Sequence, residues 1–446
     1  MADRQSNEAL RRLFREAGWT LGQCARAVNK VGGEHGTPLR YNQSAVHHWL
    51  GGTVPRNETV RTIIAEAFTR RLGRPVSPVA AGFPALTGRT TRADTVDGLI
   101  ELGRHDMDPS RRGVLGAGLF SVALTIPGWP DVVGRAEAVQ SGRASRIGMN
   151  EVDMVVAMTE RISELDDRFG GRHARPMACA FLVNTVAAYL RMDAPGAVRK
   201  AMLSAASDLL YLTGYMAVDE GLHGLAQRYY VKALELAGAA EDHLTYCTTL
   251  RGMSVQAVGL RHGNKAMELA DAAATASPKA GPRMSAFLAG QQAHAAAQTG
   301  DRAAALRRMR EAESAMDRAE SRAAVFGSYD PASLNYHIGE VRYELGDIRA
   351  SVEAMERSTR LLHDVYRRAR VRHWAILAER RLQIGHLEAA CAAWSQALDD
   401  YPMVQSARAD DRMREMFRSL RPYVKNAQAR ELYERARGVV PARLVR

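Results

Sequence analysis

The chain has 446 residues, of which 46% are hydrophobic and 25% charged, a composition typical of a globular protein with two or three domains. It has no run of twenty apolar residues, so we expect no membrane span. Its four cysteines (Cys24, Cys179, Cys247 and Cys391) are widely spaced, so we expect no disulfide framework and no bound metal. We also expect no cofactor and a cytoplasmic location. The net charge is +12, and half of it lies in residues 1–76, which favours a phosphate-bearing partner, although a solvated basic surface explains the same charge.

Four short amphipathic helices are predicted within residues 1–76. Apolar residues recur at helical spacing in "NEALRRLFREAG", "TLGQCARAV", "NQSAVHHWLGG" and "NETVRTIIAEAFTRRLG". Thr20 and Gln23 form a capping-box pattern at the start of the second helix, and Asn42 is a candidate N-cap of the third. Four short helices with basic exposed faces indicate a helix-turn-helix domain.

The third of these helices is the candidate DNA reader. Short polar side chains at the N-terminal end of a recognition helix contact base edges in the major groove, while flanking basic or hydroxyl groups contact phosphates. We therefore predict a double-stranded DNA partner. The predicted base-reading residues are Asn42, Gln43, Ser44, His47 and His48, and the predicted phosphate contacts are Arg40, Tyr41, Arg56 and Arg61. A small protein-interaction domain is the alternative.

The stretch "QSAVHHWLGGTVPR" resembles the third helix of lambda-repressor-like (XRE-type) regulators. More broadly, "GWTLGQCARAVNKVGGEHGTPLRYNQSAVHHWLGGTVPR" is similar to the N-terminus of actinobacterial regulators that join such a domain to tetratricopeptide-like helices. The resemblance implies a transcriptional regulator of development or secondary metabolism. The insert "VGGEHGTPLR" is longer than the three- or four-residue turn of a standard helix-turn-helix, and Asn42-Gln43 replaces the acidic and basic pair expected in that group.

Residues 77–147 are predicted to form a linker. Residues 77–109 are rich in Pro, Gly and Thr and are expected to be a flexible connection. They are followed by "SRRGVLGAGLFSVALTIPGWP" from Ser110, which has the twin arginine and apolar run of an export signal. Its apolar core of thirteen residues spans about 20 Å as a helix, less than the hydrocarbon layer of about 30 Å, and it follows an apparently intact domain. We therefore expect a docking helix around 110–127, with export as the alternative.

Residues 148–446 are predicted to form a tetratricopeptide-like solenoid. Turn glycines recur 37 to 46 residues apart, at Gly263, Gly300, Gly346 and Gly385, and each is followed by an alanine-rich amphipathic helix. About six helical pairs fit between residues 175 and 437, and the alternative is an irregular bundle. The segments "LDDRFGGRHARPMACAFL" and "GYMAVDEGLHGLAQRYYVKALELA" also resemble the repeat half of the same actinobacterial group.

A solenoid presents a concave groove that binds peptides, proteins or small effectors. The candidate effector residues are Tyr211, Tyr215, Tyr229, Tyr230 and Asn335, although tyrosines at this spacing are also common in cores. Phosphate-loop, nucleophile-elbow and zinc-protease motifs are absent, which argues against an enzyme.

The sequence thus predicts an all-α protein with a helix-turn-helix head and a helical-repeat body. The expected function is sequence-specific DNA binding by a homodimer whose body binds an effector or partner. The alternative is a helical-repeat scaffold without sequence-specific DNA binding.

Overall fold

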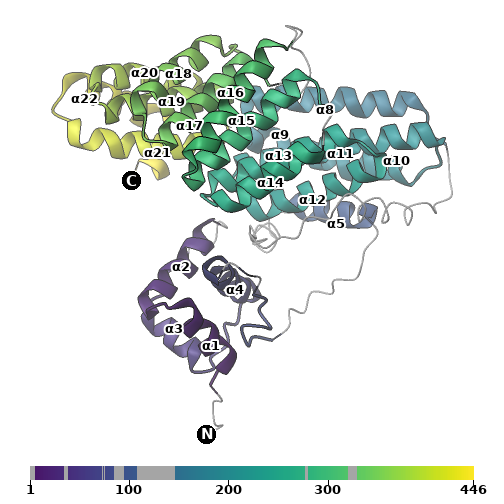
Figure 1. Cartoon of the computed structure of the whole chain (residues 1–446), viewed down its shortest axis with the longest axis horizontal. Helices are drawn as coiled ribbons and strands as arrows, with labels where there is room; N and C mark the ends of the chain where they lie inside the picture. The colour runs from purple at the N-terminus through teal and green to yellow at the C-terminus, as the bar shows by residue number, and fades with distance from the viewer. Residues whose placement is uncertain are drawn as a thin grey trace.

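The computed structural model describes residues 6–84, 95–107 and 146–445, apart from 35–38, 73, 75, 277–279 and 320–328. Every regular element in these ranges is helical, and the one β-type contact there is an isolated bridge between Arg146 and Asp193. The all-α prediction is therefore confirmed. A small head and a larger helical-repeat domain are the two parts of the described chain (Figure 1).

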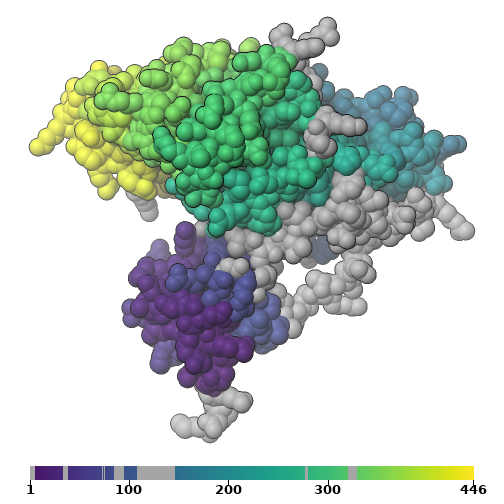
Figure 2. All heavy atoms as spheres, in the orientation of Figure 1, coloured from purple at the N-terminus to yellow at the C-terminus, as the bar shows by residue number. Residues whose placement is uncertain are grey.

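The head contains four helices: α1 (Glu8–Ala17), α2 (Leu21–Glu34), α3 (Gln43–Leu50) and α4 (Glu58–Leu72). The apolar residues that define the amphipathic pattern meet in one core, in which Ile63 and Ile64 are fully buried. Trp19 packs on Phe68 with ring centroids 5.0 Å apart. Figure 2 shows the head as a lobe distinct from the rest of the molecule.

The head's core extends beyond the expected boundary at residue 76. Val76, Ala81 and Phe83 are buried in the same core as the four helices. Asn7 fastens this extension, because its side chain caps α1 at Leu10 N–H and donates to the carbonyl of Ala81 at 3.0 Å. The head therefore comprises the described residues up to 84.

The second helix is longer than the sequence pattern suggests. The insert was expected to begin at Val31, but α2 continues through Gly32 and Gly33 because Val31 is buried in the core and anchors the last turn. Asn29 on this helix then fixes the chain before α3: its side chain accepts from Tyr41 N–H at 2.9 Å and donates to the Tyr41 carbonyl at 2.8 Å.

One helix of the predicted linker packs on the repeat domain. This is α5 (Thr95–Met107), in the part of 77–147 that was expected to be a flexible connection. Its Asp106 is buried and accepts from Arg175, from Tyr229 Oη at 2.8 Å and from Cys179 Sγ at 2.8 Å. The docking helix predicted around 110–127, with its twin arginine, lies outside the described residues.

The repeat domain begins with α8 (Met149–Phe169), α9 (Gly171–Phe181), the π-helical segment η2 (Leu182–Val186) and α10 (Ala187–Arg191). Six helix pairs follow in the described residues between Gly196 and Val439, whereas the sequence pattern placed about six between residues 175 and 437. Consecutive pairs pack side by side as in a solenoid. The pairs are α11 (Gly196–Asp219) with α12 (His223–Ala240), α13 (His243–Gly259) with α14 (Gly263–Ala276), α15 (Pro282–Thr299) with α16 (Arg302–Asp317), α17 (Pro331–Glu344) with α18 (Ile348–Leu361), α19 (Arg367–Gln383) with α20 (Leu387–Asp400), and α21 (Ala407–Leu420) with α22 (Ala427–Val439).

Three of the four predicted turn glycines lie in the turns within these pairs. Gly300, Gly346 and Gly385 have φ between 81° and 85°, the left-handed region that glycine adopts most easily. The α13–α14 turn is different: Arg261 takes the left-handed conformation, with φ 64°, and Gly263 is the first residue of α14.

The beginning and the end of the repeat domain meet. Helix α8 packs against α19, and the turn after α8 pairs with the chain before α21. Gln405 N–H donates to the Phe169 carbonyl at 2.7 Å, and Arg172 N–H donates to the Gln405 carbonyl at 3.2 Å. Gly170, with φ 89° and ψ 165°, makes this approach possible, because a Cβ there would lie 2.5 Å from the Gln405 oxygen. We call these contacts the closure.

Among the described helices, α11 is long and apolar enough to cross a membrane by length and composition. However, 78% of its most apolar window is buried within the repeat domain, and a core helix passes the same test.

The closure predicts that Gly170→Ala will destabilise the repeat domain. Its backbone conformation is essentially restricted to glycine and costs another residue on the order of 1–3 kcal/mol, to which the clash with Gln405 adds. The matched control is Gly196→Ala, at the first position of α11, where a Cβ meets nothing within 4 Å. The unfolding temperature of the full chain should fall clearly for Gly170→Ala and change little for Gly196→Ala. Equal unfolding temperatures of the two variants would contradict the role of the closure.

Candidate functional site

The exposed face of α3 carries the predicted base-reading side chains. Asn42 is the N-cap and accepts from Ala45 N–H at 3.2 Å, so its side-chain oxygen is already engaged in holding the helix start. The side chains of Gln43, Ser44, His47 and His48 are exposed. Val46 and Trp49 are buried on the opposite face and fix how α3 sits on the head.

The predicted phosphate contacts divide into two groups. Arg40 and Arg56 are exposed on either side of α3 in the sequence. Arg61, in contrast, is used within the head, because its guanidinium donates to the carbonyls of Pro55 at 2.8 Å and Arg56 at 3.2 Å. Tyr41 packs edge-on against Trp49 with centroids 4.9 Å apart. Arg61 and Tyr41 therefore support the surface that Arg40 and Arg56 present.

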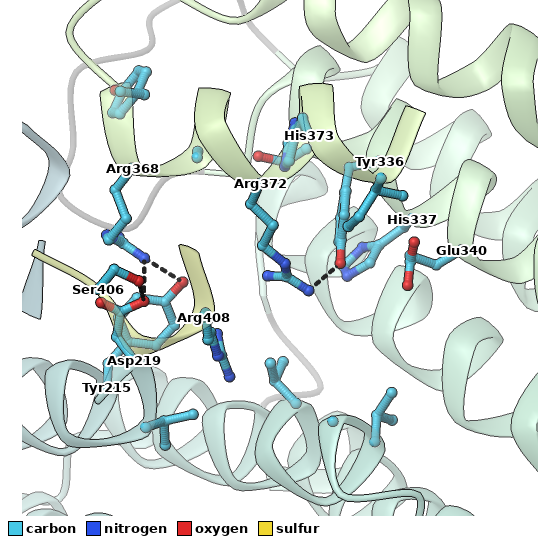
Figure 3. A pocket seen from close by; sticks show the side chains of 18 of the residues that line it. Tyr215, Asp219, Tyr336, His337, Glu340, Arg368, Arg372, His373, Ser406 and Arg408 are labelled. Carbon is cyan, nitrogen blue, oxygen red and sulfur yellow. Dashed lines mark hydrogen bonds and ion pairs between the residues drawn. The ribbon is translucent and has the colours of Figure 1, made fainter. Parts of the chain in front are cut away.

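The repeat domain contains a cavity of about 970 Å³ that is partly open to solvent, which we call the chamber. Its wall is formed mainly by α8 and by the first helix of each pair, while most of the second helices lie outside. Figure 3 shows side chains from α11, α17, α19 and α21 pointing into it. The lining helices are α8, α11, α13, α15, α17, α19 and α21.

The predicted effector residues do not all reach the chamber. Tyr211 and Tyr215 line it. Tyr229 and Tyr230 are fully buried in the core, because they lie on α12, the outer helix of its pair, with its apolar face turned towards α11. Asn335 lies outside the lining, where it donates to the Pro331 carbonyl and accepts from Arg357.

Arg368 on α19 joins one wall of the chamber to the closure. Its guanidinium lies 3.0 Å from Asp166 Oδ2, 3.1 Å from Asp167 Oδ1 and 3.4 Å from Tyr215 Oη. Asp219 completes the group, 3.9 Å from Arg368, where it accepts from Ser406 Oγ at 2.8 Å (Figure 3). Three helices, and through Ser406 the start of α21, are thereby connected by polar contacts around one guanidinium.

The wall formed by α17 and α19 is aromatic and charged. The Tyr336 and His373 rings stack 4.6 Å apart at 8°. Arg372 donates to Tyr336 Oη and lies over the same ring. Burial alone would raise the pKa of Glu340, but Arg380, which forms an ion pair with it, dominates together with His294 and lowers this pKa to about 2. Glu340 therefore stays ionised in the chamber wall.

The sequence contains a signal for the chamber that is not a motif but a periodic pattern. Polar and aromatic residues recur every three or four positions along α11, α15, α17 and α19, where a packed helix would place apolar residues. On α19 this series includes Arg368, Arg372 and Glu379, and on α11 it includes Tyr215 and Asp219. A polar stripe on an otherwise buried helix indicates a water-filled interior.

The chamber has the groups of a binding site. Its wall offers guanidinium donors, carboxylates, imidazoles and aromatic faces from separate helices. In the described part of the chain, no group of three or more His, Cys, Asp or Glu side chains could hold a metal ion.

Comparisons with known proteins give one partial family match. A family model described as the SP15 N-terminal domain matches residues 10–84, which are nearly the whole described head. No curated protein matches the chain. A crystal structure of the APC/C hetero-tetramer Cut9–Hcn1 aligns over 91% of this chain and 76% of the matched chain, at 13% identity and a TM-score of 0.35. This similarity is too low to support a conclusion.

The buried histidines of the chamber predict a dependence of stability on pH. Burial lowers the pKa of His373 to about 3, whereas an unfolded histidine titrates near 6.5. The contribution of neutral His373 to the free energy of unfolding is complete above pH 6.5. It is lost as the pH falls towards 3, because the unfolded chain then takes up a proton that the folded chain excludes. This histidine alone should contribute a slope of up to about 1.4 kcal/mol per pH unit.

The measurement is the free energy of unfolding between pH 7.5 and 5. His373→Gln should reduce the loss of stability on acidification, whereas His386→Gln, at an exposed histidine, should not. A wild-type stability that is constant over this range would contradict the prediction.

Proposed function

We propose that this chain is a sequence-specific DNA-binding transcriptional regulator whose repeat domain binds an effector in the chamber. The arrangement of α3 is the observation that carries the proposal. Its buried face fixes it to the head, and its N-terminal half exposes Gln43 and Ser44, which are side chains suited to base edges. Arg40 and Arg56 add exposed positive charge beside them.

The resemblance to actinobacterial lambda-repressor-like regulators implies a role in development or secondary metabolism, and we propose the same role for this chain. We also propose that the protein is cytoplasmic, has no enzymatic activity and acts as a homodimer. One small head buries too little DNA surface for tight specific binding, so two heads on two half-sites are proposed. Light scattering on the full chain, with and without DNA, tests this: a monomer in both samples would exclude the dimer.

A protein-interaction scaffold is the second candidate. The all-helical repeat domain favours it, because stacked helix pairs present extended surfaces to protein partners and need no DNA to do so. In this case the head would also contact protein. The two functions differ in salt dependence, since DNA binding weakens steeply with salt through counterion release.

Genomic DNA pull-down with the purified full chain, sequenced at two salt concentrations, is the deciding experiment. The regulator should recover a defined motif, most informatively a two-fold repeat, in a yield that falls as the salt concentration rises. Recovery of no DNA, or only of unselective DNA that is lost at moderate salt, would favour the scaffold.

Two substitutions on the head test the role of α3. Gln43→Ala should relax the base preference at one position of the motif and cost about 1–3 kcal/mol there, while Arg56→Ala should weaken binding to all sequences alike. Arg349→Ala, at an exposed position on α18 of the repeat domain, is the control. If both head variants bind DNA like the control variant, α3 is not the reader.

A further inference from the structure

Three arginines in the chamber wall form no ion pair with a carboxylate of the described residues. They are Arg251 on α13, Arg372 on α19 and Arg408 on α21. Arg251 lies over the Phe287 ring, 3.6 Å from its centroid, and its Nε is buried without a hydrogen-bond partner. Arg372 contacts Tyr336. Figure 3 shows Arg372 and Arg408 on different helices beside the same cavity.

Arg408 is the least satisfied of the three. Across the described residues it has no hydrogen bond or ion pair, although it is half-buried in the wall of the chamber. Burial and then the like charge of Arg372 lower the pKa of Arg408 below its ordinary value. A cation placed in such an environment is unfavourable unless an anion compensates it.

The carboxylates of the wall supply only part of that compensation: Asp219 favours the charged form of Arg408, but burial and the charge of Arg372 outweigh it. Nearly all of these carboxylates are already engaged. Arg368 holds Asp166, Asp167 and Asp219. The other ion pairs are Arg380 with Glu340, Arg412 with Glu379, Arg261 with Glu344, Arg161 with Glu164 and Arg414 with Asp411. Of the two remaining carboxylates, Asp330 caps α17 and Glu160 is exposed on α8.

We propose that the chamber binds a small organic polyanion, whose phosphoryl or carboxylate groups are held by Arg251, Arg372 and Arg408. This inference deepens the effector half of the proposed function and is independent of DNA binding. Guanidinium groups bind phosphate and carboxylate oxygens through paired N–H donors, and the nearby side chains of Tyr215 and Tyr336 add aromatic surface for the body of the ligand.

The size of the chamber favours a small molecule over a longer polymer. Its volume of about 970 Å³ is at the upper end of the range for small-molecule sites. The three arginines lie on separate helices, so a ligand with two or more anionic groups would connect α13, α19 and α21. Arg408 is two residues from Ser406, whose hydroxyl donates to Asp219 at the closure. A ligand bound to Arg408 would therefore also affect this hydrogen bond.

The test is calorimetric titration of the full chain at constant ionic strength, with sodium pyrophosphate in one arm and sodium citrate in the other. We expect saturable binding of one molecule per chain in at least one arm, and the arm that binds distinguishes phosphoryl from carboxylate recognition. Arg408→Gln and Arg372→Gln should each weaken this binding at least tenfold. Arg349→Gln, on the exposed surface of α18, should leave it unchanged.

Circular dichroism and the unfolding temperature of each variant establish that it is folded, and Arg251→Gln replaces any variant that is not. Absence of saturable binding in both arms overturns the proposal, as does equal binding by the folded chamber variants and the Arg349→Gln control. The DNA pull-down is independent of these titrations, so a chain that binds DNA but neither anion retains the regulator proposal and loses this one.

Discussion

The closure is the constraint on which the chamber depends. A solenoid of helix pairs is normally open, because each pair contacts only its neighbours. Here the turn around Gly170 forms backbone hydrogen bonds with Gln405, and Arg368 gathers the carboxylates of Asp166, Asp167 and Asp219 at the same place. Because helices that are far apart in the sequence meet there, the concave surface becomes a partly enclosed cavity, and the charges that face it are partly shielded from bulk water.

This enclosure gives the arginines of the chamber their significance. On an open surface, an arginine without a carboxylate partner is solvated and carries little information. In the chamber, Arg368 and Arg380 are paired with acidic side chains, whereas Arg408 is not. The asymmetry between paired and unpaired cations therefore indicates where a ligand's negative charge would be accommodated. The head is built differently, because its core fixes α3 while the polar residues of α3 remain exposed.

Local patterns in the sequence were sufficient for much of the fold. The helix periodicity predicted the four head helices, and Asn42 caps α3 as expected. The turn glycines predicted the repeat, although Arg261 replaces glycine in one turn. The boundary of the head was less predictable: Phe83 belongs to its core only because Asn7, over seventy residues earlier, binds the backbone of that segment.

The sequence by itself thus determined the all-helical class, the repeat and the surface residues of α3, because these follow from spacing within one helix or one turn. Only the tertiary structure decided which tyrosines face the chamber. Tyr215 and Tyr230 are equally plausible in the sequence, but one lies on the inner helix of its pair and the other on the outer helix. The pairing of Arg368 and the isolation of Arg408 depend on helices brought together by the closure, and no local pattern specifies such contacts.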